Sequence, residues 1–388
     1  MLQQYKRLAI ISDCIHTKDE AGNVLTENHI FRRQMEALAK HFEHITIVCP
    51  FINKPANSVT TAYTLSSIEF IATPNAGGNT IKDKWLLFKT IPTWVRSFSK
   101  AHKTADIFYL RMPGNIAIPA FFYFYLKASK TFATYTGTWK NYKGEPLTYR
   151  FQKWLLKHFF KGAVFAYIHE SEQRNNLFKT FSPSYSITEW NEETMQVSER
   201  IECYNSTLVR PVFITVGALV PNKNQSYILE VCRVLALAGF SFYWYIVGDG
   251  YMKAAHAAFI AKHNLHAFVN MTGKKTAEEL RKLYRASDFV VQATLIEGFG
   301  KAPVEAMFHG VIPILSCTAM AEEMTGNGAR GYIFDASNVE NLLAIIMNIK
   351  KERNRFGSMI EDAREYVKIQ SLENWSNGIM QVINTKYN

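Results

Sequence analysis

Cysteine is scarce in this sequence, and the residue patterns that bind metals are absent. The five cysteines are odd in number, far apart and free of any C-x-x-C pair: Cys14, Cys49, Cys203, Cys232 and Cys317. No Asp-x-Asp occurs, and His16, His29 and His169 show no metal-ligand spacing. We therefore expect no disulfide framework, no bound metal ion and a reducing, cytoplasmic location.

Long apolar runs are missing as well. The longest, at residues 116–126 (IAIPAFFYFYL), falls short of the roughly 20 residues that a membrane-spanning helix needs. The apolar run at residues 8–11 is too short for the core of a signal peptide. We expect no transmembrane segment, which leaves peripheral contact with the inner face of the cell membrane as the way to reach lipid.

The composition is that of a folded protein with an uneven charge. The 388 residues are 48% apolar and 20% charged, which predicts a large core and, at about 150 residues each, two domains. Residues 1–200 hold 25 Lys and Arg against 16 Asp and Glu, whereas residues 201–388 hold 19 against 17. The net charge of +11 therefore lies mostly in the first half, where we expect any anionic partner to bind.

Both halves show an α/β pattern. In the first half, strands at residues 8–12 and 44–49 flank an amphipathic helix at residues 30–42, which is a βαβ unit. Further strand-like runs occur at residues 68–72, 106–110 and 131–135. We expect a parallel sheet. Residues 182–210 are rich in Pro, Ser, Asn and acidic residues, and we expect them to form a long connection between domains.

The second half restarts the same alternation. Strands are expected at residues 212–216, 242–247, 268–271, 288–292, 311–315 and 331–334. Helices are expected between them, for example at residues 224–237, 277–285 and 338–349. Ligands of open α/β sheets bind at the carboxyl ends of the strands, so we look for the site in the loops that follow them.

The most informative stretch is residues 292–315 (QATLIEGFGKAPVEAMFHGVIPIL). The turn Gly298, Phe299, Gly300 follows a strand, and Pro303 suits the first position of a helix, which should begin at about residue 302. The free N–H groups and the dipole of that helix would face the turn. They predict an anion site of the kind a pyrophosphate occupies.

Two glutamates flank this turn. Glu297 precedes it, and Glu305 is expected near the third helical position, so both can point into one crevice. Carboxylates beside a phosphate site repel it unless they accept hydrogen bonds from neutral hydroxyls. Sugars and riboses offer such hydroxyls.

The run E-G-F-G-K-A-P-V-E, with its glutamates eight apart, resembles the E-x7-E motif of a large family of retaining glycosyltransferases (glycosyl transferases group 1, family 4). The resemblance implies the α/β fold called GT-B, in which two Rossmann-like domains with parallel sheets face a central cleft. Residues 1–200 would bind the acceptor, residues 201–370 the nucleotide-sugar donor, and residues 371–388 would form a helix that returns to the first domain. Glu297 would contact the donor sugar and Glu305 the ribose, with the turn's amides near sugar and phosphate.

Three further segments resemble the family in the same order along the chain. In residues 216–224 (VGALVPNKN), Gly217 and the diphosphate-binding Lys223 match the family pattern, but Ala218 stands where an arginine is usual. Lys301 is the nearest candidate to supply the missing charge. The other two matches are Gly248, in IVGDG, and the turn that would pass the base, Gly273 and Lys274.

The first half carries fewer signals. The family's Gly-Gly loop is replaced by residues 13–28 (DCIHTKDEAGNVLTEN), and residues 133–139 lack the histidine often found there, so we assign no catalytic base. Arg111, expected just after a strand, can meet donor phosphates or an anionic acceptor, or be an ordinary solvated arginine. Residues 82–103 alternate basic and aromatic residues. They fit either a helix that lies on an anionic membrane or a core-packing helix with a basic outer face.

These features together predict a retaining, metal-independent glycosyltransferase of hexosyltransferase type. It would move a sugar from a UDP- or GDP-sugar to a saccharide or lipid-linked saccharide, with no cofactor besides the donor, and the resemblance suggests surface-polysaccharide synthesis. Glu297, Lys223 and Lys301 would assist the transfer. The alternatives are a GT-B nucleotide-sugar epimerase or hydrolase, or a non-enzymatic basic protein that binds nucleic acid. Against the last, no nucleic-acid-binding motif is present, so we expect no nucleic-acid partner.

Overall fold

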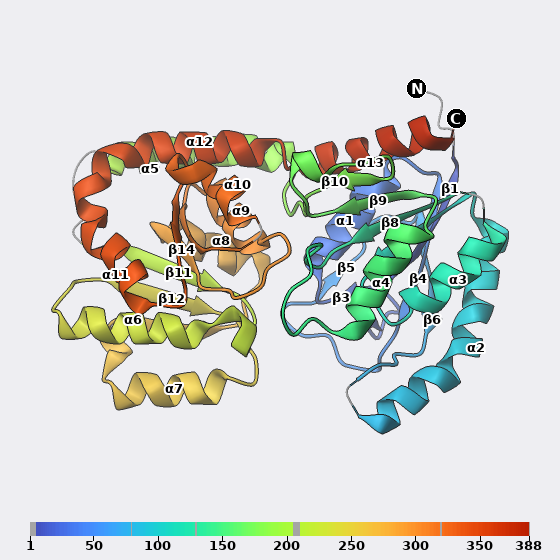
Figure 1. Cartoon of the computed structure of the whole chain (residues 1–388), viewed down its shortest axis with the longest axis horizontal. Coiled ribbons are helices and arrows are strands. Elements are labelled where there is room, and N and C mark those ends of the chain that lie inside the picture. The colour runs from blue at the N-terminus through green and yellow to red at the C-terminus, as the bar shows by residue number, and fades with distance from the viewer. Residues whose placement is uncertain (1–4, 79, 129, 205–209, 319, 388) are drawn as a thin grey trace. The chain divides into compact units, whose positions relative to one another are not determined.

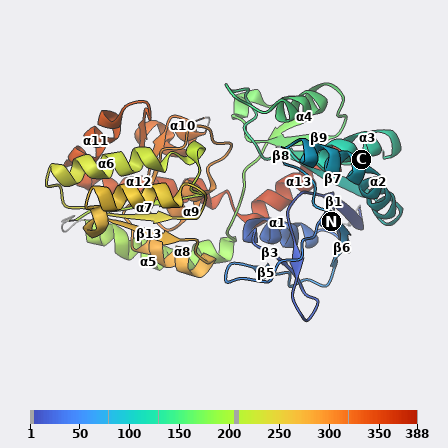
Figure 2. The same ribbon diagram turned by 90° about the horizontal axis from the view of Figure 1, so that it is seen from below.

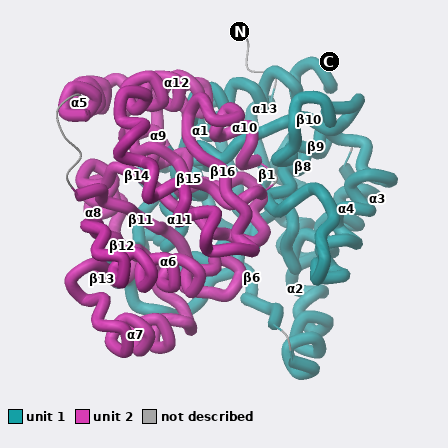
Figure 3. Tube along the Cα trace, turned by 60° about the vertical axis from the view of Figure 1, so that its left-hand side comes forward, with its two compact units in different colours: residues 1–184, 372–388 teal, residues 185–371 magenta. Residues whose placement is uncertain are grey.

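The computed structural model describes residues 5–78, 80–128, 130–204, 210–318 and 320–387. The chain forms two compact units, of which unit 1 comprises Met1–Ser184 with Leu372–Asn388, and unit 2 comprises Tyr185–Ser371 (Figure 3). The first segment of unit 1 ends at residue 184, which is sixteen residues before the expected domain boundary at residue 200.

Unit 1 is built on a seven-stranded sheet in which every neighbouring pair is parallel, in the order β10-β9-β8-β7-β1-β4-β6 (Figure 1). The strands are β1 (Arg7–Ile11), β4 (His44–Pro50), β6 (Ile68–Thr73), β7 (Ile107–Met112), β8 (Thr131–Tyr135), β9 (Ala163–Ala166) and β10 (Leu177–Lys179). Its helices are α1 (His29–Ala39), α2 (Ile81–Thr104), α3 (Ala117–Lys127), α4 (Leu147–His158) and α13 (Leu372–Tyr387). Most strand residues are buried, as expected of a parallel sheet covered on both faces.

A small antiparallel sheet is added to unit 1 at the segment that replaces the family's Gly-Gly loop. Its order is β2-β3-β5, with strands β2 (Thr17–Lys18), β3 (Val24–Thr26) and β5 (Thr61–Ala62). β2 and β3 follow β1 in the chain, and β5 follows β4, so this sheet lies at the carboxyl ends of two neighbouring strands of the large sheet.

The last helix, α13, packs within unit 1. Its buried face, with Trp375, Ile379 and Ile383, belongs to the same core cluster as Met35 of α1. The imidazole of His41 and the Ser376 hydroxyl are 3.1 Å apart.

Unit 2 is built on a six-stranded parallel sheet in the order β13-β12-β11-β14-β15-β16. The strands are β11 (Val212–Val216), β12 (Tyr243–Val247), β13 (Val269–Gly273), β14 (Phe289–Gln292), β15 (Ile312–Ser316) and β16 (Tyr332–Phe334). The helices are α5 (Ile187–Tyr204), α6 (Gln225–Leu237), α7 (Lys253–Lys262), α8 (Ala277–Arg285), α9 (Lys301–Phe308), α10 (Ala321–Thr325), α11 (Val339–Asn348) and α12 (Phe356–Lys368). Helices α6 and α7 lie side by side (Figures 1 and 2).

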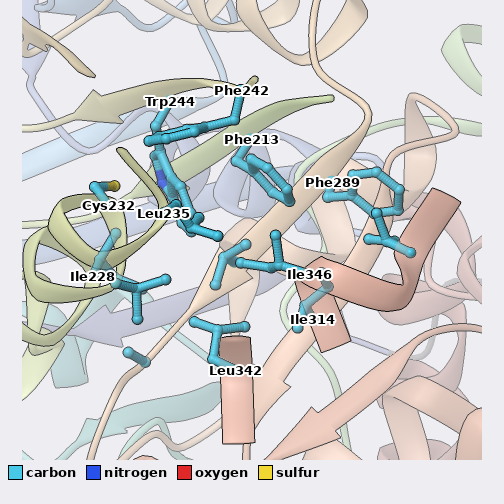
Figure 4. Packing of buried hydrophobic residues seen from close by; sticks show 14 of the residues in the cluster. Phe213, Ile228, Cys232, Leu235, Phe242, Trp244, Phe289, Ile314, Leu342 and Ile346 are labelled. Atoms are coloured by element: carbon cyan, nitrogen blue, oxygen red, sulfur yellow. The ribbon is translucent and has the colours of Figure 1, made fainter. Parts of the chain in front are cut away.

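Aromatic rings fix the centre of the unit 2 core. Phe213 of β11 stacks on Trp244 of β12 with ring centroids 4.7 Å apart, and it packs against Phe289 of β14 on the other side (Figure 4). These rings come from three adjacent strands and lock their register. The register in turn decides which loop residues meet at the carboxyl ends of the strands.

The expectation of a long connection between domains at residues 182–210 was wrong for residues 187–204, and residues 205–209 lie outside the described residues. Residues 187–204 form the helix α5, which belongs to unit 2 and packs on α12. The helix buries Val197 and Tyr204 but also the acidic Glu193, whose carboxylate accepts hydrogen bonds from His309 (2.7 Å) and Arg285 (2.9 Å). Acidic residues scattered along the segment hid the few apolar positions that pack the helix in place.

Replacing Glu193 by glutamine is expected to lower the free energy of unfolding at neutral pH. Burial raises the pKa of the Glu193 carboxyl, but the hydrogen bonds from His309 and Arg285 outweigh it and lower this pKa to about 2. A depressed carboxyl pKa stabilises the fold above the unfolded value of 4.5, so a stabilisation of roughly 2 to 3 kcal/mol is lost as the pH falls from there toward 2. Urea unfolding at neutral and acid pH measures it.

The matched control is Glu192→Gln on the exposed side of α5. It should change stability by less than about 0.5 kcal/mol. If the free energy of unfolding of wild type and of Glu193→Gln falls by the same amount on acidification, the Glu193 carboxylate is not the group that makes stability depend on pH.

Candidate functional site

Three glycines that the sequence singled out meet at one edge of the unit 2 sheet. Gly217, Gly248 and Gly273 end or follow β11, β12 and β13, and the amide of Gly248 donates to the carbonyl of Gly273 at 3.0 Å. Gly248 has φ 146°, and a Cβ there would lie 1.9 Å from the carbonyl oxygen of Gly217. Only glycine allows the backbones to approach this closely.

Lys223 and Glu297 form an ion pair next to this edge, although 74 residues separate them. Lys223 ends the short 3-10 turn Pro221–Lys223 after β11, and Glu297 lies in the loop after β14. Asn222 connects the two loops through two hydrogen bonds of 2.9 Å. Its carbonyl accepts from the amide of Leu295, and its side-chain amide donates to the carbonyl of Ile296. Each charged side chain stays about a quarter exposed, at 25% and 27%.

The helix after the glycine turn begins one residue earlier than expected. α9 starts at Lys301, with Gly300 as its N-cap in a left-handed conformation (φ 84°). Pro303 is therefore its third residue rather than its first. That position still suits proline, because the first four N–H groups of a helix have no partner within it.

The two glutamates contact different partners. Glu305 is the fifth residue of α9, not the third, and its Oε2 accepts a hydrogen bond of 3.4 Å from the Tyr284 hydroxyl at the end of α8. Burial raises the pKa of the Tyr284 phenol, so the hydroxyl keeps its proton and donates it. Sequence reasoning missed Tyr284 and Asn222, although Asn222 stands beside the lysine that it did identify.

The remaining predicted residues of unit 2 lie around this region with different exposure. Phe299 is buried, which makes its side chain part of the packing and leaves its backbone to face the turn. Gly298 and Lys301 are half-buried. Lys274 is exposed. The pKa of the Asp249 carboxyl is lowered mainly by the hydrogen bond from the Gly250 amide, and the charges of Lys253 and Lys274 add to this effect.

Arg111 belongs to unit 1 and is anchored there. It lies inside β7 rather than just after a strand, and its guanidinium donates to Gln34 at 3.3 Å and to the Tyr109 hydroxyl at 3.2 Å. The guanidinium also lies 4.9 Å from the centre of the Phe31 ring.

The parts of the chain that the structure describes contain no cluster of three or more His, Cys, Asp or Glu side chains placed to hold a metal ion. Within the same residues, no helix is both long and apolar enough to span a membrane.

Comparison with solved structures identifies the fold as GT-B, which confirms the expected fold class. Sucrose-phosphate synthase from Thermosynechococcus elongatus superposes with a TM-score of 0.72 at 15% identity, covering 98% of each chain. Anabaena Alr3699/HepE, solved in complex with UDP and glucose, superposes with a TM-score of 0.70 at 14% identity, covering 98% of this chain and all of that one. At this identity the likeness concerns the fold alone.

Residues 203–366 of the chain match the family described as glycosyl transferases group 1, which confirms the predicted resemblance to that family for this part of unit 2. The uncharacterized glycosyltransferase MJ1178 of Methanocaldococcus jannaschii is 25% identical over 167 residues. That alignment covers 43% of this chain and 46% of the relative, so the chain spans less than half the length of this curated relative.

Gly248→Ala is expected to destabilise unit 2 and weaken nucleotide binding there, because the added Cβ would collide with the carbonyl of Gly217. Gly239→Ala is the matched control, since Gly239 also has a positive φ (66°) but no atom within 4 Å of the added Cβ. A positive φ strains both variants, and at Gly239, where φ is close to the left-handed helical value, this strain costs about 1 to 2 kcal/mol. Urea unfolding and UDP titration should therefore show a larger loss for Gly248→Ala, and equal losses would contradict the close approach.

Proposed function

We propose that this protein is a retaining, metal-independent glycosyltransferase that moves a sugar from a UDP- or GDP-sugar to a saccharide or lipid-linked saccharide. The observation that carries the proposal is the Lys223–Glu297 pair beside the glycine-lined edge of the part of unit 2 that matches the group 1 family. The UDP and glucose in the complex of the Anabaena protein favour a nucleotide-sugar donor for this chain too.

The ion pair gives each of its partners a role in donor binding. A diphosphate that reaches this edge competes with Glu297 for the ammonium of Lys223, since both are anions. Once the lysine binds the phosphate, the carboxylate of Glu297 is left to accept hydrogen bonds from neutral sugar hydroxyls. Hydrogen bonds to charged groups contribute roughly 1.5 to 3 kcal/mol each, enough to position a sugar ring.

Positive potential at the start of α9 supports the same assignment. The helix begins at Lys301, directly after the glycine turn, and its dipole places partial positive charge at that end. In the proposed reaction the anomeric C–O bond breaks and negative charge grows on the leaving diphosphate. Lys223, Lys301 and the start of α9 would stabilise that charge, and the diphosphate oxygen would take the acceptor's proton.

The direct test is incubation with UDP- and GDP-sugars in the presence and absence of saccharide acceptors. A donor at 100 times its dissociation constant should stabilise the folded protein by about 2.7 kcal/mol, which thermal unfolding detects. Nucleotide released at the same rate with and without acceptor, and no sugar transferred, would instead favour the hydrolase or epimerase alternative. Salt-dependent duplex binding without any nucleotide-sugar binding would favour the nucleic-acid alternative.

Lys223→Ala and Lys301→Ala are each expected to lower catalytic efficiency by about ten- to a hundredfold, because each removes a charged donor from the diphosphate. If both contact one phosphate group, the double variant should lose less than the product of the two effects. Lys262→Ala, an exposed lysine on α7, is the control and should match wild type. A Lys301→Ala enzyme within twofold of wild type would remove this lysine from the site.

We also propose that α2 brings unit 1 to an anionic membrane surface. In its first half Trp85 and Phe88 are 65% and 67% exposed, and Lys82, Lys84 and Lys89 are exposed beside them. Most of the core packing of α2 comes from its second half, through the buried Trp94 and Phe98, while Leu87 of the first half is partly buried against the same core cluster. The alternative of a core-packing helix therefore fits half of α2, while the first half exposes the aromatic and basic groups that suit a lipid headgroup layer.

Changing Lys82, Lys84 and Lys89 together to glutamate is expected to abolish co-sedimentation with vesicles of anionic lipid at low salt, because each basic group near such a surface contributes about 1 kcal/mol. Donor binding should not change. The control makes the same change of charge in unit 2, at the exposed lysines 262, 282 and 351. Equal sedimentation of both triple variants would leave α2 as an ordinary surface helix.

A further inference from the structure

Unit 1 contains a cavity of about 430 Å³ that the proposed donor site does not use. It lies where the added β2-β3-β5 sheet meets the carboxyl ends of β1 and β4, and it is lined by residues from three segments, 13–17, 25–28 and 52–60. Its volume is in the range of small-molecule sites. The carboxyl ends of parallel strands are also where ligands of α/β sheets bind.

Asp13 forms one side of the cavity. Its Oδ2 accepts a hydrogen bond of 3.0 Å from the amide of Asn115. The backbone after β7 passes so close that a Cβ on Gly114 would lie 2.3 Å from the Asp13 carboxylate. The carboxylate is thus held between β1 and β7, the two neighbouring strands at which the order of the sheet reverses.

Glu27 and Lys54 are the other charged residues of the lining. The Glu27 carboxylate accepts from the ammonium of Lys54 at 2.9 Å and from the side-chain amide of Asn57 at 2.8 Å. The Thr17 hydroxyl fixes the Lys54 backbone by donating to its carbonyl at 2.6 Å. The charge of this lysine is therefore already matched by a carboxylate at the cavity.

His16 also lines the cavity, and its imidazole ring is uncharged. Its Nδ1 lies 2.8 Å from the Cys14 carbonyl, which can only accept, so Nδ1 carries the proton and Nε2 accepts from the Tyr63 hydroxyl at 2.9 Å. Burial lowers the pKa of the imidazole to about 4, which keeps the ring neutral. The ring stacks on Phe51 and Tyr63.

We propose that this cavity binds an uncharged, hydroxyl-rich ring of about monosaccharide size. Among its charged side chains, Glu27 and Lys54 neutralise each other, so the Asp13 carboxylate gives the lining a net negative charge. Hydroxyl donors are therefore favoured and anions are disfavoured. The aliphatic lining residues Ile15, Leu25 and Ile52 suit the C–H face of a sugar ring. That this ring belongs to the acceptor rests on the proposed function, whereas the binding of a neutral sugar does not.

The charge of the cavity runs opposite to that of the half of the chain that holds it. Residues 1–200 carry 25 basic against 16 acidic residues, which led us to expect an anionic partner there. The two charges therefore act at different ranges. The basic surface attracts anionic groups over several ångströms, whereas the carboxylates of the cavity select a neutral ring at contact. A phosphate of a lipid-linked acceptor would accordingly stay outside.

Saturation-transfer NMR with the neutral probes methyl α-glucoside, methyl α-mannoside and methyl β-galactoside tests the proposal. At least one should bind wild type, and glucuronate and glucose 6-phosphate should bind much more weakly. Asp13→Asn should weaken the neutral probe by about tenfold, because a hydroxyl bonds more strongly to a carboxylate than to an amide. No signal from any neutral probe, or equal binding of glucuronate, would overturn the proposal.

Two further variants keep the test sharp. Glu27→Gln removes the second carboxylate and should also weaken the neutral probe, which covers the case in which Asp13→Asn fails to fold by circular dichroism. Glu69→Gln, an exposed carboxylate on β6 outside the cavity, is the matched control and should bind like wild type. Unchanged sugar binding in both cavity variants would place the sugar elsewhere and end the proposal.

The same samples separate this proposal from the proposed function. UDP titration and sugar transfer report on unit 2 and on the whole reaction, whereas the monosaccharide probes report on the cavity alone. UDP binding and transfer without any effect of Asp13→Asn or Glu27→Gln on the neutral probes would refute the cavity and leave the transferase standing. If these variants weaken the binding of the neutral probes but the protein neither binds UDP nor transfers sugar, the cavity proposal would stand and the proposed transferase function would be refuted.

Discussion

The candidate donor site depends on the contact between Lys223 and Glu297, because this pair joins the loop after β11 to the loop after β14. The two strands are neighbours in the sheet, so their carboxyl ends lie side by side although 74 residues separate the charges. A pair that is a quarter exposed contributes at most about 1 kcal/mol to stability. The pair matters mainly because of where it places its two groups. Together with the Asn222 hydrogen bonds, it keeps the ammonium that is proposed to bind the diphosphate next to the carboxylate that is proposed to bind the sugar.

The sequence predicted the elements of unit 2 well, because buried parallel strands appear as short apolar runs. The strand at residues 212–216 and the helix at 277–285 match the structure residue for residue, as does the unit 1 strand at 131–135. Contacts between distant residues were beyond the sequence. The Lys223–Glu297 pair needs the strand register, and the Tyr284–Glu305 hydrogen bond needs the packing of α8 against α9. α5 was missed because its buried Glu193 looks like a solvent-exposed residue until His309 and Arg285 are placed beside it.

Unit 1 shows that net charge and local charge answer different questions. The basic residues of the first half act over about a Debye length, roughly 8 to 10 Å at physiological salt, and decide which surfaces approach. In the proposed binding, the groups inside the cavity act at hydrogen-bonding distance and select the ring that fits. The composition gives the net charge of the first half but not the local charge of the cavity, because Asp13 and Glu27 come together only through the added β2-β3-β5 sheet.

The chain crosses between its units twice, after Ser184 and after Ser371, and both crossings are tied to the helix that begins at the glycine turn. The Tyr185 hydroxyl donates to the carbonyl of Val367 at 2.8 Å, which links the segment entering unit 2 to α12 just before the chain leaves. The Tyr185 ring stacks on Phe308, the last residue of α9, at 4.3 Å, and Arg364 of α12 donates to the Phe308 carbonyl at 2.6 Å. α9 starts at Lys301 and carries Glu305. The contacts of Tyr185 and Arg364 therefore fix the C-terminal end of the helix whose first turns carry the proposed donor contacts.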